Sequence, residues 1–402
     1  MNDIPFSANF TEPVGSPIRE LFTYLSRPGM ISFAGGYPSP GLLDGFGLIE
    51  ASRRAFATGA EALQYGATEG APVLRAALAS LCAERGISCT ASDILVTTGS
   101  QQALDLLIRV FIEPGDIVYV EAPTYPAATQ ALRLAGARIE QVPVDEDGLQ
   151  TKRLEAMLVA ASKDDRPKFF YTVPTFSNPC GALLTEQRRE HLVRLAAEYG
   201  FLILEDDPYG ELSFVDEHIA PVHSVGARLL NCRNPVIYLS SLSKTVAPSL
   251  RIGWMIAPPD VIRRCAIAKQ TIDLCTSSIS QLIAAEYLQS GRYPETLRRA
   301  RNEYALRMQI LIDAVQEEAG TLMRAQKPRG GLFVWIALDE QLDPKILFDA
   351  SVESGVVYVP GAAFYASNPV ARTMRLSFAA QNSAQIVEGV RRLGKAASVA
   401  IA

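Results

Sequence analysis

The segment YLSSLSKTVAPSLRIGW, which begins at residue 238, places a lysine amine among hydroxyl groups. Lys244 follows Ser241 and Ser243, and Arg251 comes seven residues later. An amine attacks an aldehyde, while hydroxyl and guanidinium groups bind phosphate, so the set suits a cofactor that carries both groups. The alternative is that Lys244 is a solvated surface charge, and the other motifs bear on that choice.

An acidic run, Glu205-Asp206-Asp207, follows an apolar stretch and precedes Pro208 and Tyr209. A carboxylate beside a pyridine nitrogen keeps that nitrogen protonated, and the resulting cation withdraws electrons from a bound substrate. Asp206 is the candidate for this role. Acidic residues after a strand also cap turns, and we expect Glu205 and Asp207 to do only that.

The segment TTGSQQ, residues 97–102, joins a predicted strand to an amphipathic helix. Its free backbone N–H groups and the positive end of the helix dipole make Ser100 and Gln101 candidates for binding a phosphate. The alternative is an ordinary helix cap. Neither GxGxxG nor GxxxxGK[ST] occurs, which disfavours dinucleotide and nucleoside-triphosphate sites.

Two further strand ends carry groups that suit a planar ligand. Tyr125, in EAPTYP, offers an aromatic ring for stacking, and Asn178, in SNPCG, offers an amide donor. Each segment alone is also compatible with a plain turn.

Short β-branched runs bounded by turn residues predict buried strands, and helical patterns separate several of them. This alternation predicts a mostly parallel sheet covered on both faces, with the ligand beyond the carboxyl ends of the strands. The predicted strands are Ile94–Thr97, Ile117–Val120, Phe169–Val173, Phe201–Leu204, Val236–Leu239 and Ile252–Ile256.

The pattern changes after about Gln281. A long charged helix over residues 292–318 precedes GGLFVW, from residue 330, and TMRLSF, from residue 373, which are typical of a smaller α+β domain. The first forty residues are rich in Pro and Gly, and we expect them to form an extended arm that lies against the second domain, as part of it, or against a partner subunit. We therefore predict an N-terminal arm over residues 1–45, a large domain over residues 46–285 and a small domain over residues 286–402.

The composition predicts a globular protein that binds small molecules. A length of 402 residues, 48% of them apolar, is enough for a large and a smaller core. The net charge of -5 disfavours nucleic acid, because phosphate contacts need clustered Lys and Arg. We see no signal peptide or membrane span and expect a soluble, cytoplasmic protein without a membrane partner. The three histidines and six scattered cysteines predict neither a metal site nor disulfides.

Together these motifs resemble those of the fold-type I, class I/II aminotransferases, which use pyridoxal 5'-phosphate (PLP). The resemblance extends from FAGGYPSP, residues 33–40, to Arg375 in MRLSF. It implies a large α/β domain, whose mostly parallel seven-stranded sheet is sandwiched by helices, and a smaller α+β domain. It also implies PLP as the cofactor.

The resemblance also implies roles for individual residues. Lys244 would hold the cofactor aldehyde as a Schiff base and move the substrate α-proton, while Asp206 would pair with the ring nitrogen. Tyr209 and Asn178 would bind the phenolic oxygen, and Tyr125 would stack on the ring. The phosphate would be bound by Ser100, Gln101, Ser241, Ser243 and Arg251.

Arg375 matches the arginine that binds the substrate α-carboxylate, with Asn178, Gly36 and Tyr37 beside it. The segments SPIREL and RPGMISFAGG look like those of bacterial 2-aminoadipate and kynurenine/2-aminoadipate aminotransferases. In the bacterial branch, the arginine matching Arg19 lies on a mobile segment and reads an acidic side chain. The alternative is that Arg19 is a helix or interface charge. Tyr37 stands where those enzymes usually carry an aliphatic residue, so the resemblance does not decide the identity of the substrate.

Tyr65, in QYG, resembles the tyrosine that reaches the phosphate of a neighbouring subunit, which implies a homodimer with shared active sites. The expected reaction is a ping-pong transamination. An L-amino acid of the 2-aminoadipate, glutamate, aromatic or branched-chain type would give its amino group to a 2-oxo acid such as 2-oxoglutarate. The alternatives are a PLP-dependent C–S β-lyase and a PLP-binding sensor, since some transcription regulators contain this fold.

Overall fold

The computed structural model describes residues 6–7, 10, 15–217, 219–230 and 234–401. Its strands are β1 (Ile31–Ser32), β2 (Ile94–Thr98), β3 (Ile117–Ala122), β4 (Arg138–Asp145), β5 (Gly148–Leu149), β6 (Phe169–Thr172), β7 (Leu202–Asp206), β8 (Val236–Ser241), β9 (Ile252–Ile256), β10 (Met323–Gln326), β11 (Phe333–Leu338), β12 (Val356–Val357), β13 (Val359–Pro360) and β14 (Thr373–Ser377). Its helices are α1 (Pro17–Glu20), α2 (Gly45–Ala57), α3 (Pro72–Glu84), α4 (Ser100–Phe111), α5 (Pro126–Leu134), α6 (Thr151–Ala160), α7 (Glu186–Tyr199), α8 (Val222–Leu230), α9 (Pro259–Gln270), α10 (Ser278–Gln289), α11 (Tyr293–Ala319), α12 (Pro344–Glu353) and α13 (Ser383–Val399), with the 3-10 turns η2 (Leu21–Ser26) and η4 (Gly59–Leu63).

The large sheet has the strand order β2-β9-β8-β7-β6-β3-β4-β5. Strands β8, β7, β6, β3 and β4 are parallel, whereas β9 runs antiparallel to both of its neighbours. The predicted α/β fold is confirmed, and all six predicted strands belong to this sheet. The sheet has eight strands rather than seven, because the two-residue β5 pairs with the edge of β4.

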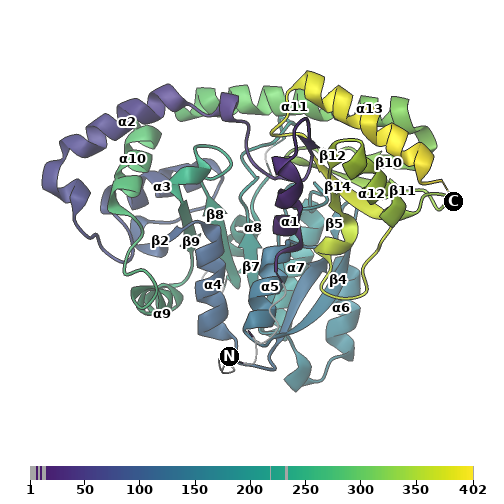
Figure 1. The fold of residues 1–402 in the computed structure, drawn as a ribbon. Helices are drawn as coiled ribbons and strands as arrows, with labels where there is room; N and C mark the ends of the chain where they lie inside the picture. The colour runs from purple at the N-terminus through teal and green to yellow at the C-terminus, as the bar shows by residue number, and fades with distance from the viewer. Residues whose placement is uncertain (1–5, 8–9, 11–14, 218, 231–233, 402) are drawn as a thin grey trace.

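Side chains of the central strands alternate between two hydrophobic cores, because successive residues of a strand point to opposite faces. Val118 and Tyr171 belong to the core that contains buried residues of α4 and α5. Tyr119 and Phe170 belong to the core that contains buried residues of α6 and α7. Helices therefore cover both faces of the sheet, as Figure 1 shows.

The C-terminal part forms a second, antiparallel sheet with the order β10-β11-β14-β13. Helices α11 and α13 contact each other and run side by side along the upper edge of the molecule in Figure 1. The predicted long helix and both predicted strands of this part are present. The exact domain limits, at residues 45 and 285, stay predictions.

The N-terminal segment differs from the extended arm that we expected. Residues 17–26 form α1 and the 3-10 turn η2, and β1 pairs in parallel with β12. The buried side chain of Leu21 packs in a cluster with Trp335 and Val357, which gives these short helical turns a tertiary anchor. Residues 1–5, 8–9 and 11–14 of the predicted arm lie outside the described residues.

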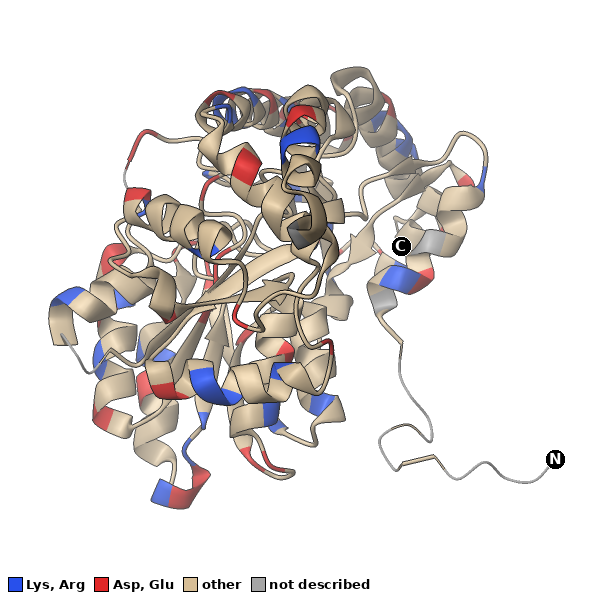
Figure 2. Cartoon of the chain, turned by 90° about the vertical axis from the view of Figure 1, so that its left-hand side faces the viewer, with Lys and Arg blue, Asp and Glu red and all other residues tan. Residues whose placement is uncertain are grey.

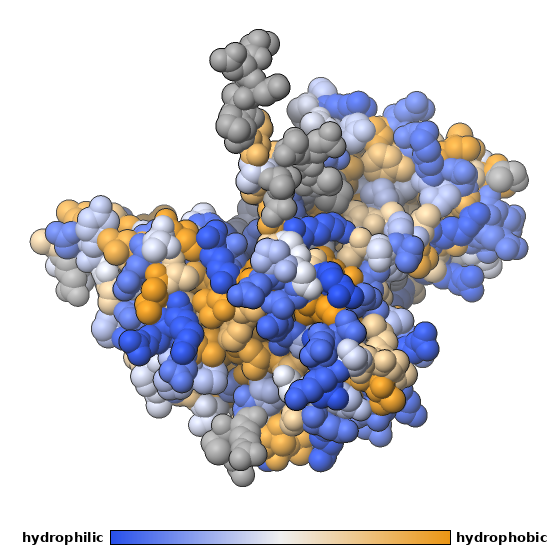
Figure 3. Space-filling model, turned by 90° about the horizontal axis from the view of Figure 1, so that it is seen from below, coloured by the Kyte–Doolittle hydropathy of each residue, from blue (hydrophilic) through white to orange (hydrophobic). Residues whose placement is uncertain are grey.

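Charged residues of both signs are mixed along the helices in Figure 2. Figure 3 likewise shows hydrophilic and hydrophobic residues interspersed on the lower face. Among the described residues, no helix has the length and apolar composition needed to cross a membrane.

Candidate active site

The carboxyl edge of the large sheet collects most of the side chains that the sequence singles out. Strands β3, β6, β7 and β8 are parallel and end there, and Ser241 pairs with Gly253 at the start of β9. Strand β2 ends at the same edge, where Thr98 pairs with Ile252. The residues gathered here are Ser100, Gln101, Tyr125, Asn178, Asp206, Tyr209, Ser241, Ser243, Lys244 and Arg251.

Lys244 lies just beyond β8 in a half-buried position, and its Nζ donates a hydrogen bond to the carbonyl oxygen of Gly36 at 2.8 Å. Burial, together with the positive charges of Arg375 and Arg251, lowers the pKa of Lys244 to about 8. A lysine with this pKa is partly neutral near physiological pH. It is therefore able to act as a nucleophile or a base.

Modification of Lys244 should follow this low pKa. Reductive methylation needs the neutral amine, so its rate at Lys244 in the cofactor-free protein should rise with pH to a midpoint near 8 rather than the ordinary 10.5. Peptide mass spectrometry over a pH series measures this rate. A midpoint above 10 would contradict the prediction.

Asp206 ends β7 and is buried, with 6% of its surface exposed. Its Oδ2 accepts a hydrogen bond from the Tyr171 hydroxyl at 2.7 Å, whereas its Oδ1 has no partner among the described residues. Burial raises the pKa of Asp206 to about 6, against the lowering effect of the Tyr171 hydrogen bond. An unpartnered, buried carboxylate oxygen is the atom that a protonated ring nitrogen would satisfy.

The sequence did not point to Tyr171. It lies inside β6, where a tyrosine reads as an ordinary core residue, and its contact with Asp206 joins positions 35 residues apart. Tyr171 is fully buried, and its hydrogen bond fixes the orientation of the Asp206 carboxylate.

Two glycines allow the turn after β2 to approach Arg251 and β9 closely. Gly99 has a φ of 80°, and a Cβ there would lie 2.5 Å from the Arg251 guanidinium. A Cβ on Gly253 would lie 2.4 Å from the backbone nitrogen of Ser100. The start of α4 also lacks a side-chain cap, which leaves its first N–H groups available for an anion.

Hydroxyl groups at the end of β8 face this turn. The Ser241 and Ser243 hydroxyls lie 2.7 Å apart, and the Ser243 backbone N–H donates to the Ser241 oxygen at 3.0 Å. Arg251 adopts a left-handed conformation with a φ of 55°, and its guanidinium lies close to Gly99. The hydroxyls, the guanidinium and the open N–H groups fit a phosphate, and the free Asp206 oxygen fits a pyridinium.

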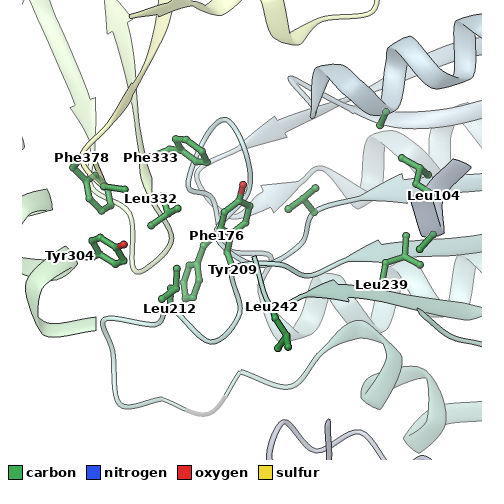
Figure 4. Packing of buried hydrophobic residues seen from close by; sticks show 14 of the residues in the cluster. Leu104, Phe176, Tyr209, Leu212, Leu239, Leu242, Tyr304, Leu332, Phe333 and Phe378 are labelled. Carbon is green, nitrogen blue, oxygen red and sulfur yellow. The ribbon is translucent and has the colours of Figure 1, made fainter. Parts of the chain in front are cut away.

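The aromatic and amide groups lie between this cluster and the second sheet. Burial raises the pKa of Tyr209, and a hydrogen bond with Asn178 acts in the opposite direction. The rings of Tyr209 and Phe333 meet edge to face with their centroids 5.8 Å apart. Figure 4 shows both rings among the buried hydrophobic residues. Burial also raises the pKa of Tyr125, against the charges of Arg375 and other arginines. Tyr209 and Asn178 therefore connect the cluster at the sheet edge with Phe333 and Arg375 of the second sheet.

Arg375 comes from β14 of the second sheet and is 1% exposed. Its Nη1 donates to the Asn178 side-chain oxygen at 2.6 Å, and its Nη2 donates to the carbonyl oxygen of Ala34. Its Cζ lies 4.2 Å from the centre of the Phe333 ring. Nε has no partner, and none of the described salt bridges gives Arg375 an acidic partner. Burial accordingly lowers its pKa to about 10.

The remaining candidates lie at the rim. Arg19 in α1 is exposed, and its charge lowers the pKa of Tyr125, so it lies within electrostatic range of the site. Tyr37 is half exposed, and its ring lies 2.7 Å from where a Cβ of Gly35 would stand. Tyr65 is 78% exposed on the segment after η4.

A buried ionic layer supports the end of β7. Asp207 accepts hydrogen bonds from Arg85 at 2.8 Å and from the Gly210 N–H at 3.0 Å. Glu205 accepts from the first N–H groups of α8 and lies 3.8 Å from Arg189. Glu205 and Asp207 cap backbone N–H groups as expected, but capping is not their only role, because each also pairs with a buried arginine that the sequence did not reveal.

Neither metal ligands nor disulfides contribute to this region within the part of the chain that the structure describes. No group of three His, Cys, Asp or Glu residues able to hold a metal occurs among the described residues. The five cysteines within them are free, and Cys180 is buried close to Asn178 in the sequence.

Comparisons with known proteins show the family of this chain. The family model described as "Aminotransferase class I and II" matches residues 44–393. Aromatic-amino-acid aminotransferase 1 of Thermococcus litoralis is 42% identical over 383 residues, which cover 94% of this chain and 91% of the relative.

Two solved structures resemble the whole chain. One is the alpha-aminoadipate aminotransferase of Thermus thermophilus, complexed with N-(5'-phosphopyridoxyl)-L-leucine. Its TM-score is 0.89 at 38% identity, and the aligned part covers 98% of this chain and 97% of that chain. The kynurenine aminotransferase of Pyrococcus horikoshii, in complex with PMP, has a TM-score of 0.92 at 39% identity and covers 98% of this chain and 96% of its own.

Proposed function

Because this chain belongs to the aminotransferase class I and II family, we propose that it transfers the amino group of an acidic, aromatic or branched-chain L-amino acid to 2-oxoglutarate. It is a pyridoxal-phosphate-dependent transaminase, and its substrates are an amino acid and a 2-oxo acid. The donor, the acceptor and the residue roles given below are the proposal.

The observation that carries the proposal is the buried charge of Arg375. A guanidinium with 1% exposure and only neutral oxygen partners costs free energy unless an anion binds it. The α-carboxylate shared by every amino acid and 2-oxo acid substrate has the charge and the planar shape for a two-point contact. Arg375 therefore binds this carboxylate, and Asn178 orients the guanidinium.

Lys244 and Asp206 divide the remaining chemistry. When bound, pyridoxal phosphate supplies an electron sink that stabilises negative charge at the substrate α-carbon. The Lys244 Nζ removes the proton from that carbon, because a pKa of about 8 leaves enough of the amine neutral. With the cofactor bound, the Asp206 Oδ1 would pair with the ring nitrogen and keep it protonated, while Tyr171 holds Oδ2.

The other groups at the sheet edge position the cofactor. With the cofactor bound, Tyr209 and Asn178 would donate hydrogen bonds to its phenolic oxygen, and Tyr125 would stack on the ring. The phosphate is held by Ser100, Gln101, Ser241, Ser243 and Arg251. The close approach of Gly99 and the Arg251 guanidinium supports this assignment, since it brings the turn and the charge to one place.

The substrate side chain extends toward Arg19, Gly36 and Tyr37. The named substrates of the similar enzymes, which are aromatic amino acids, alpha-aminoadipate and kynurenine, support a pocket that accepts long side chains. The charge of Arg19 favours an acidic side chain, and the ring of Tyr37 favours an apolar one.

The visible absorption spectrum of the holoenzyme tests the proposal. L-2-aminoadipate, L-glutamate and L-leucine are added one at a time with no oxo acid present, so that only one half of a ping-pong reaction can proceed. Loss of the yellow colour, and its return on adding 2-oxoglutarate, is the expected result. Release of pyruvate and ammonia from a cysteine conjugate, with no such cycle, would indicate a β-lyase instead.

Replacing Arg19 by glutamine should slow the reaction of acidic donors selectively. We expect kcat/KM for L-2-aminoadipate to fall about tenfold, because a hydrogen bond to a charged group contributes roughly 1.5 kcal/mol. The value for L-leucine should stay unchanged. The matched control is Arg27→Gln, since Arg27 lies over the ring of Tyr24, 4.9 Å from its centre. Equal losses for both donors would show that Arg19 is structural.

The exposed apolar residues of α2 and η4 support a homodimer with shared active sites. Phe46, Ile49, Phe56 and Leu63 are between 54% and 77% exposed, and Tyr65 follows them. Large exposed apolar patches mark association surfaces, and a second copy of this chain covers this one. Light scattering should give twice the chain mass of 43.6 kDa, and a monomer would contradict this arrangement.

The location we propose is the cytoplasm. The free state of all five described cysteines supports a reducing compartment. Cell fractionation with an activity assay tests this, and activity outside the cytoplasm would contradict it.

A further inference from the structure

The turn that joins β2 to α4 carries open N–H groups but has no cap of its own. Gly99 has a φ of 80°, and no side chain caps the first turn of α4. The orientation of the backbone N–H groups of Ser100 and Gln101 therefore depends on the residues on either side of the turn. Those flanking residues are Thr98 and Gln102.

Both flanking residues are tied to one carboxylate. The Thr98 hydroxyl donates to the Asp273 Oδ2 at 3.0 Å, and the Gln102 side-chain amide donates to the same oxygen at 2.8 Å. The Thr98 backbone N–H donates to the Gln102 Oε1 at 2.8 Å, which closes the turn on itself. Asp273 thus holds the two ends of the turn together.

A buried lysine completes the network. The Lys269 Nζ donates to the Asp273 Oδ1 at 2.6 Å and to the Gln102 Oε1 at 3.1 Å. Its side chain is 0% exposed. A buried ion pair is often no more stabilising than apolar residues of the same volume, so helix stability alone does not account for it. Both charged groups instead form hydrogen bonds with Gln102 of the turn, which lies 167 or more residues away in the sequence.

We propose that the Lys269–Asp273 pair is a positioning device that fixes the phosphate-binding turn before the cofactor arrives. This inference rests on the proposed function, because it requires that Ser100 and Gln101 bind the cofactor phosphate. The pair bonds to Thr98 and Gln102 on either side of the turn rather than to Ser100 or Gln101. It acts through Thr98 and Gln102, and it holds the N–H groups at the spacing that an anion needs.

Inorganic phosphate is the probe, and calorimetric titration of the cofactor-free protein gives its affinity. Lys269→Met keeps the side-chain length and removes the charge, and Thr98→Val removes one hydroxyl. We expect Lys269→Met to weaken phosphate binding about tenfold and Thr98→Val about threefold. These losses of affinity lie at or below the low end of the loss in metal affinity when a residue supporting a metal ligand is removed. At saturating cofactor, kcat should change less than the cofactor affinity.

The matched control is Arg307→Met. Arg307 also forms a buried pair with a residue four positions away, Glu303 at 2.7 Å, but it lies in α11. This control should lose thermal stability and keep the parental phosphate affinity.

Unchanged phosphate affinity in folded Lys269→Met and Thr98→Val proteins would overturn the positioning role. If Lys269→Met does not fold, Thr98→Val alone decides the question. Arg251→Gln separates the two proposals, because it removes the guanidinium beside Gly99 and leaves the backbone N–H groups of the turn in place. If Arg251→Gln binds phosphate as tightly as the parent, the placement of the phosphate is wrong, and the inference fails with it.

Discussion

Replacing Lys244 with alanine should lower the transamination rate by about 10⁴-fold, at the upper end of the contribution of a positioned general base. The Lys244 Nζ donates to the Gly36 carbonyl oxygen, and burial together with Arg375 and Arg251 lowers its pKa to about 8, which leaves part of the amine neutral. Stopped-flow spectroscopy of the half-reaction with L-2-aminoadipate measures the effect directly.

Two further variants separate the base from the charge. Lys244→Arg keeps a positive charge that does not deprotonate, so it should be as inactive as Lys244→Ala. Lys345→Ala removes a lysine whose side chain is 89% exposed and should leave the rate unchanged. A Lys244→Ala protein that transaminates at the parental rate would refute the assignment.

Replacing Asp206 with asparagine should lower kcat by between about 10-fold and 10³-fold. An opposite charge nearby shifts the pKa of an ionisable group by roughly 1–3 units, and each unit corresponds to a tenfold change in the protonation equilibrium of that group. Asparagine has the same shape and lacks the charge, so the ring nitrogen would lose its proton while the cofactor stays bound. The yellow colour should therefore remain, and the single-turnover rate should fall.

The neighbouring variant Asp207→Asn provides the control. Asp207 pairs with Arg85 and caps the turn at Gly210, so its loss should lower the melting temperature more than kcat. If Asp206→Asn and Asp207→Asn have equal effects on rate and on stability, Asp206 has a structural role.

The sequence predicted the sheet because its strands are short, apolar and buried on both faces. It predicted the candidate site because Lys244, Asp206 and Arg251 follow or precede such strands. The family, the cofactor and the class of reaction are confirmed. The roles of the individual residues and the domain limits stay predictions.

The supporting contacts were not predictable in the same way. Tyr171 and Lys269 act through partners 35 and 167 residues away, and no local pattern distinguishes them from ordinary core and helix residues. The helical turns of residues 17–26 were missed because their tertiary anchor, around Trp335, is far away in the sequence. Local periodicity reports which face of an element is buried, but it does not report which residue that face meets.

The separation of the reaction machinery from the N-terminal segment has an evolutionary consequence. The groups that handle the cofactor stand on buried strand ends, where most substitutions disturb a hydrophobic core. Arg19 stands on α1, which is joined to the rest by a small apolar cluster around Leu21 and Trp335 and lies ahead of Ala34 and Gly36, the residues that contact Arg375 and Lys244. Exchange of roughly the first thirty residues would therefore give descendants of one ancestor a route to new amino acid preferences, while the inherited contacts of Lys244 and Arg375 stay intact.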